Sequence, residues 1–92
     1  MSYFIEHDQQ RQCFSTTVDN QKAILEYFLN GSIMTITHTF VPHALEGKGI
    51  ASALTKEALL FASSNDLKVH PVCSFSKTYF ERHSEWKSLK IS

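Results

Sequence analysis

Cysteine, glycine and proline are all scarce in this sequence, which has two, three and two of them among 92 residues. The two cysteines, Cys13 and Cys73, stand far apart, and neither has metal-type spacing to a neighbouring Cys or His. His43, His70 and His83 also lack ligand-like spacing. The spacing therefore predicts neither a disulfide framework nor a metal site. We expect both cysteines to be free thiols in a reducing compartment.

Net charge is absent as well: nine basic and nine acidic residues give +0, and the basic ones are scattered. Nucleic acid is therefore not expected as a partner, because binding its phosphate backbone needs a concentrated positive surface. No apolar run approaches membrane-spanning length, and the first eight residues turn polar before a signal-peptide core could form. We expect a soluble, cytoplasmic protein without a membrane partner. The sequence does not determine its oligomeric state.

Length limits the architecture. A chain of 92 residues with 42% hydrophobic content fits one compact domain, residues 1–92, with a single core. We therefore expect no separately folded substrate domain and expect this one domain to hold the whole site.

The first part of the chain alternates apolar and polar residues, as strands do. Strands are predicted at 3–7, 12–18, 22–29 and 32–41, the last ending near Phe40, and the odd-numbered residues of the third should face the core. Asp19-Asn20 suits a tight hairpin turn, and Asn30-Gly31 predicts a two-residue turn of type I′. Together these strands predict an antiparallel meander.

The period of the pattern changes after Pro42. From Lys48 to about Asn65 the apolar residues recur at helical spacing, and Thr55 belongs to the polar stripe. A fifth strand is predicted at 67–73, with Pro71 at an edge or a break in the ladder, then a second helix at 76–83 and a partly ordered tail. The fold class is α/β of the α+β kind: a four-stranded antiparallel meander, a helix, a fifth strand parallel to the fourth, and a short C-terminal helix.

The turn Gly47-Lys48-Gly49-Ile50-Ala51 lies where a strand has ended and the long helix begins. Glycine lets the backbone approach a ligand closely, and the first turn of a helix has unpaired N–H groups and a partial positive charge. Such a turn suits a phosphate or pyrophosphate. The glycines alone equally fit a sharp turn that packs the helix on the sheet, and they match neither a Walker A loop nor a Rossmann motif.

Three separated segments carry a resemblance to a known family: 36–42, 46–51 and 69–75. In this order they resemble the small GNAT-type N-acetyltransferase-like proteins, over about residues 30–86. The resemblance implies a GNAT-like core and an acetyl-CoA site, in which the ends of the fourth and fifth strands grip the pantetheine arm. The implied cofactor-binding residues are Phe40, Val41, Gly47, Lys48, Gly49, Ile50, Ala51 and Ser52.

One position departs from the family pattern. Glu46 stands where Gln or Arg is usual, and a carboxylate beside a pyrophosphate is repulsive. We expect the backbone N–H groups to carry the site, with Lys48 offsetting the carboxylate.

Acetyl transfer to an amine needs a neutral amine, a stabilised oxyanion and a proton for the departing thiolate. Strand alternation places His38 on one face with Met34, Ile36 and Phe40, where it would act as a base or tune Cys73. It equally fits a core-edge histidine with a backbone or threonine partner.

Cys73 should end the fifth strand opposite Phe40, near the acetyl group, where a thiolate would allow a covalent acetyl-Cys route. A small buried hydrophobe is the alternative for this residue. Tyr79, on the second helix, matches only in rough position a tyrosine that larger relatives use to protonate the leaving thiolate.

The leading hypothesis is an acetyl-CoA-dependent N-acetyltransferase acting on a primary amine, with direct attack preferred to an acetyl-Cys intermediate. Because the chain is too short for the helices that wall the acceptor side in larger relatives, we expect an open site that suits a peptide or protein amine. The alternative is a non-catalytic CoA or acyl-CoA sensor, favoured by Glu46 and by the lack of an obvious carboxylate base. A third hypothesis is an interaction domain whose turn binds nothing.

Overall fold

The computed structural model describes residues 3–91. It contains the predicted elements in the predicted order, with shifts of a few residues at their ends. The bounds are β1 Glu6–Asp8, β2 Cys13–Val18, β3 Gln21–Asn30, β4 Ile33–Phe40, α1 Ile50–Ser64, β5 Lys68–Pro71 and α2 Ser74–Arg82, with short 3₁₀ helices at His43–Leu45 and Ser84–Leu89.

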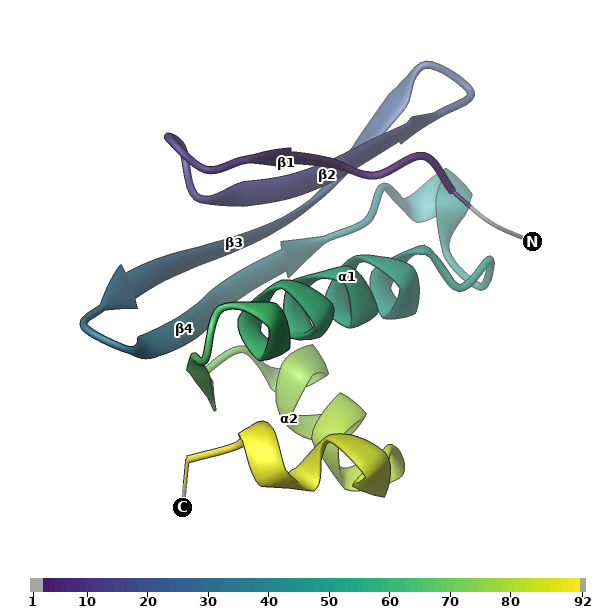
Figure 1. Ribbon diagram of the computed structural model, residues 1–92. Coiled ribbons are helices and arrows are strands. Elements are labelled where there is room, and N and C mark those ends of the chain that lie inside the picture. The colour runs from purple at the N-terminus through teal and green to yellow at the C-terminus, as the bar shows by residue number, and fades with distance from the viewer. Residues whose placement is uncertain (1–2, 92) are drawn as a thin grey trace.

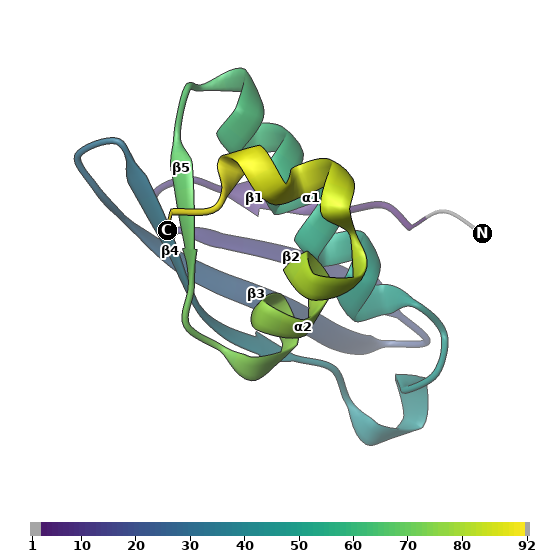
Figure 2. The same ribbon diagram turned by 90° about the horizontal axis from the view of Figure 1, so that it is seen from below.

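The strands form one mixed sheet in the order β1-β2-β3-β4-β5. Neighbours pair antiparallel up to β4, and β5 pairs parallel to β4, as the crossover through α1 predicts. Figures 1 and 2 show α1, α2 and the C-terminal 3₁₀ helix on the same face of this sheet. The opposite face carries no helix among the described residues.

The core lies between α1 and the odd-numbered residues of β3. Ala23, Leu25 and Tyr27 are buried, as predicted, whereas Leu29 at the end of the strand is 40% exposed. The prediction for Thr55 is wrong. This residue is fully buried, and its hydroxyl donates a hydrogen bond to the Ala51 carbonyl at 2.8 Å. A threonine that satisfies itself on its own helix can enter the core without another partner.

Of the two predicted hairpin turns, the one at Asp19-Asn20 is confirmed, because Val18 pairs with Gln21, and the other is shifted by one residue. Asn30 pairs with Ile33, so the two-residue loop is Gly31-Ser32 rather than Asn30-Gly31. Of these two only Gly31 has a positive φ, 61°, which is the pattern of a type II′ turn. The turn with two positive φ angles, the type I′ pattern, is at Asp19-Asn20 with 52° and 62°.

A β-bulge divides β4 in two. Tyr27 of β3 pairs with Ile36, and the preceding residue Glu26 pairs with His38, which leaves Thr37 as an extra residue on β4. One extra residue reverses the faces of all side chains that follow it. Ile36 is accordingly fully buried, whereas His38 is exposed and Thr39 takes the core-side position. The predicted common face of His38 with the buried residues of β4 is therefore wrong.

Beyond the bulge, β4 and β5 separate. Their ladder ends at the pair Ile36 and Pro71, while β4 continues to Phe40 and the chain after Pro71 turns into α2. Two strands that diverge in this way open a gap at the end of the sheet where the glycine turn also lies.

The C-terminal segment, predicted as a partly ordered tail, contains a 3₁₀ helix and makes backbone contacts with β5. The N–H of Ile91 donates to the Val69 carbonyl at 3.0 Å, and Lys90 forms a parallel bridge with Val69, so the chain end covers the outer edge of β5. Trp86 and Leu89 pack partly buried against the core, as predicted for these anchors. The last residue of the predicted tail, Ser92, lies outside the described residues. No helix between residues 3 and 91 is long and apolar enough to cross a membrane.

Candidate active site

A cleft of about 660 Å³ lies between the end of β4 and the start of α1. This volume is within the range of small-molecule and cofactor sites. The lining contains seven of the eight residues predicted to bind the coenzyme, all except Lys48, and adds four that were not predicted. The lining residues are Thr39, Phe40, Val41, Leu45, Glu46, Gly47, Gly49, Ile50, Ala51, Ser52 and Phe75.

The glycine turn leaves the start of α1 without a side-chain cap. Gly47 and Gly49 have φ angles of 81° and 77°, a conformation that other residues rarely adopt, and Gly49 is the N-cap of the helix. The helical ladder begins with the Ala53 N–H, which donates to the Gly49 carbonyl at 3.0 Å. The N–H groups of the first helical turn are therefore free to bind an anion in the cleft. This arrangement fits the diphosphate of a coenzyme.

The charged residues of the turn are arranged differently from the expectation. Glu46 lines the cleft, and its carboxylate lies 3.2 Å from Nδ1 of His43, an exposed contact. Lys48 is absent from the lining, and its backbone carbonyl accepts a hydrogen bond from the Tyr3 hydroxyl. The backbone of the turn, rather than a lysine side chain, is thus the positive feature of this end of the cleft.

Cys73 lies at the separation of the strands, where it is the N-cap residue of α2. Its N–H and that of Val72 both donate to the Ile36 carbonyl, at 3.2 and 3.0 Å. Its sulfur lies 3.4 Å from Oγ1 of Thr39 and 3.2 Å from Oγ of Ser76. The side-chain partner on β4 is therefore Thr39 and not the predicted Phe40, and the one-residue difference is consistent with the bulge.

His38 is exposed and lies opposite Glu26 of β3, on the face without helices. Among residues 3–91 no hydrogen bond joins it to Cys73. The structure does not bring these two predicted residues together, and a catalytic role for His38 stays a prediction.

Tyr79 is buried in α2, 5% exposed, with its ring stacked on that of His83 at 3.9 Å between centroids. Burial raises the pKa of Tyr79, the Glu85 carboxylate adds to the rise, and a hydrogen bond with Trp86 opposes it. These neighbours belong to the C-terminal 3₁₀ helix, and Tyr79 is not part of the cleft lining. Its role as a proton donor also stays a prediction.

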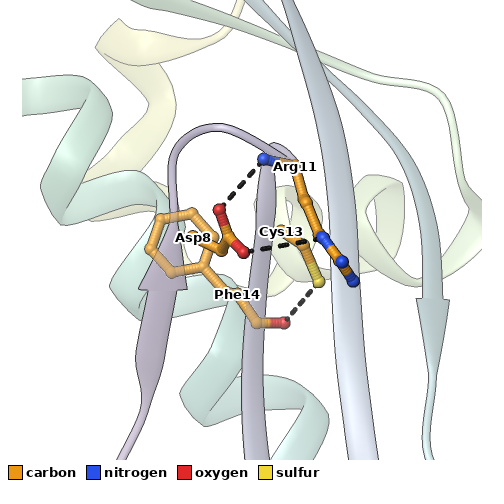
Figure 3. Close-up of polar contacts among 4 residues, drawn as sticks. All are labelled: Asp8, Arg11, Cys13 and Phe14. Carbon is orange, nitrogen blue, oxygen red and sulfur yellow. Dashed lines mark hydrogen bonds and ion pairs between the residues drawn. The ribbon is translucent and has the colours of Figure 1, made fainter.

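The other cysteine is remote from the cleft. Figure 3 shows the sulfur of Cys13 directed at the Phe14 carbonyl, 3.5 Å away, in the β1–β2 hairpin beside the contacts of Asp8 with Arg11. This hairpin lies at the opposite end of the sheet from the glycine turn (Figure 1). Burial and the nearby Glu26 raise the pKa of the Cys13 thiol, which makes it a poor nucleophile. Within the described chain, no cluster of three His, Cys, Asp or Glu residues could hold a metal ion.

Two hydroxyl residues beside Cys73, Thr39 and Ser76, were not predicted from the sequence. Ser76 stands three residues after Cys73, a spacing at which a serine in the first helical turn can reach the N-cap residue, so its local pattern could have revealed it. Thr39 had no such signal, because the bulge that turns it toward Cys73 is not visible in the alternation of the strand.

This chain has the GNAT-like acetyltransferase fold. Its sheet is mixed, and its two parallel strands separate beside the glycine-rich start of α1, which has no side-chain cap. The comparisons with known proteins agree. A model of the GCN5-related N-acetyl-transferase family matches residues 13–89, and the chain belongs to that family.

Individual relatives support the same assignment. Protein NATD1 of Mus musculus is 38% identical over 82 residues, which cover 86% of this chain and 74% of that protein. Protein NATD1 of Homo sapiens is 35% identical over 82 residues, with 86% and 73% covered. The NMR solution structure of a GCN5-like protein from Staphylococcus aureus superposes with a TM-score of 0.78 at 27% identity, covering 98% of this chain and 89% of that one. The resemblance inferred from the three segments is confirmed, and the chain is an acetyltransferase of this family.

Proposed function

We propose that this acetyltransferase moves the acetyl group of acetyl-CoA to a primary amine of a peptide or protein. The observation that carries the proposal is the continuity of one cleft. Its lining runs from the uncapped turn at Gly47 and Gly49 to Thr39, and the Thr39 hydroxyl contacts the sulfur of Cys73. One ligand with a diphosphate at one end and a thioester at the other matches this arrangement.

The two halves of the cleft have different chemistry. The first turn of α1 offers backbone N–H groups and the positive end of a helix dipole, which favour a diphosphate. Phe40, Val41 and Phe75 offer apolar surface, which favours the pantetheine arm. The separation of β4 from β5 beside Thr39 and Cys73 supports a thioester position near these two residues.

The acceptor side supports a macromolecular amine. No described helix lies on the face of the sheet opposite α1 and α2, so the site where β4 and β5 diverge is open on that face (Figure 2). A side chain on an extended peptide or a protein surface can reach such an open site, whereas a small free amine would find few walls to hold it.

In direct transfer, the neutral amine nitrogen bonds to the acetyl carbonyl carbon, and the carbon–sulfur bond breaks with its electron pair going to the coenzyme sulfur. The nitrogen loses a proton and the sulfur gains one, so the products are an amide and free coenzyme. An acetyl-Cys route through Cys73 would reach the same products in two steps. We prefer direct transfer and test the alternative below.

The test is incubation of the pure protein with acetyl-CoA, with and without a mixture of lysine peptides. We expect free CoA to appear only when the amine is present. Tight binding of acetyl-CoA without release would instead favour the sensor hypothesis, for which the Glu46 carboxylate in the lining is the supporting observation. Absence of any thermal shift with CoA would contradict both, because a bound ligand stabilises the folded state.

We also propose a cytoplasmic location. Two free cysteines and the proposed use of acetyl-CoA support it. Fractionation of cells that express the full chain tests this proposal, and recovery from a membrane or secreted fraction would contradict it.

A further inference from the structure

Three polar side chains meet where β4 and β5 separate: Thr39 from β4, Cys73 after β5 and Ser76 from α2. The sulfur of Cys73 lies between the two hydroxyl oxygens, 3.4 Å from Thr39 Oγ1 and 3.2 Å from Ser76 Oγ. Thr39 also lines the cleft, so it joins this cluster to the proposed thioester position.

The direction of these hydrogen bonds follows from the Ser76 hydroxyl. This group is fully buried and donates its one proton to the Cys73 carbonyl at 2.9 Å. A hydroxyl has one proton to donate, so toward the sulfur the Ser76 oxygen can only accept, and the donor is the Cys73 S–H. With that proton directed at Ser76, the Thr39 hydroxyl is free to donate to the sulfur.

The two neighbours therefore act on the thiol in opposite directions. An acceptor at the S–H stabilises the protonated sulfur, whereas a donor to the sulfur stabilises the negative charge that remains when the proton leaves. We propose that Thr39 and Ser76 are positioning residues of the transfer reaction, which hold the Cys73 thiol and direct its proton through these two hydrogen bonds. This inference rests on the proposed function of the cleft.

The directed S–H of Cys73 bears on the order of the chemical steps. The Cys73 S–H, directed at Ser76, can act as the proton donor for the leaving coenzyme sulfur, which favours direct transfer over attack by Cys73. As the carbon–sulfur bond of the thioester breaks, the Cys73 proton passes to the coenzyme sulfur, and the Cys73 thiolate accepts the hydrogen bond from Thr39. The acetylated nitrogen loses its proton to water, and water returns a proton to Cys73, so the enzyme ends unchanged.

The primary test needs no coenzyme: the rate at which iodoacetamide alkylates Cys73 at neutral pH, followed by intact mass. It is performed in a Cys13→Ala background, which leaves Cys73 as the only thiol. Thr39→Val should slow alkylation and Ser76→Ala should accelerate it, each by about fivefold, the size of one hydrogen bond. Thr39→Ser and Ser76→Thr, which keep the hydroxyl groups, should restore the original rate.

Opposite signs separate this proposal from a general loosening of the site, which would expose the sulfur and accelerate alkylation in both variants. Rates that change in the same direction, or Thr39→Ser behaving like Thr39→Val, would overturn it. Thermal melts of each variant show that the fold is intact, and the two hydroxyl-retaining variants supply the comparison if Ser76→Ala does not fold.

A second measurement connects the cluster to turnover. Thr39→Val should lower kcat about fivefold while the Kd for CoA stays the same, since the hydroxyl acts on the thiol and not on the phosphates. If alkylation follows the predicted signs while neither the variants nor the wild-type enzyme transfer acetyl groups, the proposed function fails and only the effect of the two hydroxyl groups on the Cys73 thiol stands. If transfer occurs but the alkylation rates do not diverge, only the positioning roles fail.

Discussion

The two ends of the cleft are built from different parts of the chain. At the glycine turn, the groups available to a ligand are backbone N–H groups, made accessible by Gly47 and Gly49 at φ angles near 80°. At the thiol end they are side chains, Thr39, Cys73 and Ser76, from three separate elements. Because the two ends use different groups, we expect affinity for the coenzyme and the rate of transfer to respond to different substitutions.

The largest effect is expected at the backbone end. Gly49→Asp puts a carboxylate and a strained φ of 77° at the N-cap of α1, beside the proposed diphosphate. We expect CoA affinity, measured by calorimetry, to fall on the order of a hundredfold, because like charges about 4 Å apart repel by several kcal/mol near a protein surface.

Gly31→Asp is the matched control for this substitution. It introduces the same side chain at a φ of 61° in the β3–β4 hairpin, where an added Cβ would meet nothing within 4 Å, as at Gly49. This variant should lose similar stability from backbone strain but keep its CoA affinity. Equal losses of affinity in both variants would show that strain, and not the phosphate site, explains the effect.

The thiol end should give the reverse result. Cys73→Ala removes the sulfur while leaving the turn intact, so kcat should fall at least about tenfold and the Kd for CoA should change less than about twofold. Cys13→Ala should change neither, since Cys13 is the first residue of β2 and the β1–β2 hairpin lies at the far end of the sheet from the glycine turn (Figure 1). An acetyl adduct that persists at full occupancy in Cys73→Ala would rule out a covalent route through this residue. A large rise in the Kd for CoA in this variant would contradict the separation of binding from chemistry between the two ends of the cleft.

A smaller effect is expected at Glu46, which carries the one carboxylate in the cleft lining of the described chain. Glu46→Gln removes its repulsion of the diphosphate, so CoA should bind about three times more tightly at low salt, with a smaller gain at high salt. Glu81→Gln, an exposed carboxylate on α2, is the control and should have no effect. Weaker binding by Glu46→Gln would mean that the contact with His43 supports the turn.

The smallest effect concerns the fold away from the cleft. His7 of β1 stacks on Phe14 with 3.9 Å between ring centroids, and its Nε2 lies 2.6 Å from the Tyr27 hydroxyl. Burial lowers the pKa of His7 below its usual 6.5, while Asp8 and Glu57 oppose the shift. The folded state thus favours neutral His7. The contribution of neutral His7 to the free energy of unfolding is complete above pH 6.5, and it is lost as the pH falls through the lowered pKa of His7 in the folded state.

Thermal unfolding tests this pH dependence. Between about pH 7.5 and about pH 5 the wild type should lose more Tm than His7→Phe does, because only the wild type has to bind a proton at His7 against the lowered pKa. His38→Phe, at an exposed position, should follow the wild type. An equal loss of Tm in wild type and His7→Phe would contradict the role of His7.

The sequence predicted the fold well where one pattern decides the structure. The alternation of Ala23, Leu25 and Tyr27 and the helical spacing after Gly49 each admit one solution, because a large apolar face must be buried. The position of the glycine turn was predictable as well, because two glycines between a strand pattern and a helical pattern indicate a turn with positive φ angles, as Gly47 and Gly49 have.

The thiol end was less predictable, because it depends on one unpaired residue. Thr37 is chemically ordinary, yet its bulge exchanges the faces of His38 and Thr39. Alternation therefore selected the histidine, whereas the structure brings the threonine to Cys73. A bulge of this kind is decided by how strands pair, which the sequence of one strand does not reveal.

The most direct measurement of the central claim is an amide NMR titration of the full chain with free CoA. We predict that the N–H resonances of Gly47 to Ser52 shift strongly and saturate together, while those of the β1–β2 hairpin around Arg11 do not move. If saturating CoA leaves the amides of the glycine turn unchanged, or shifts the hairpin instead, the assignment of the cleft as the coenzyme site is wrong.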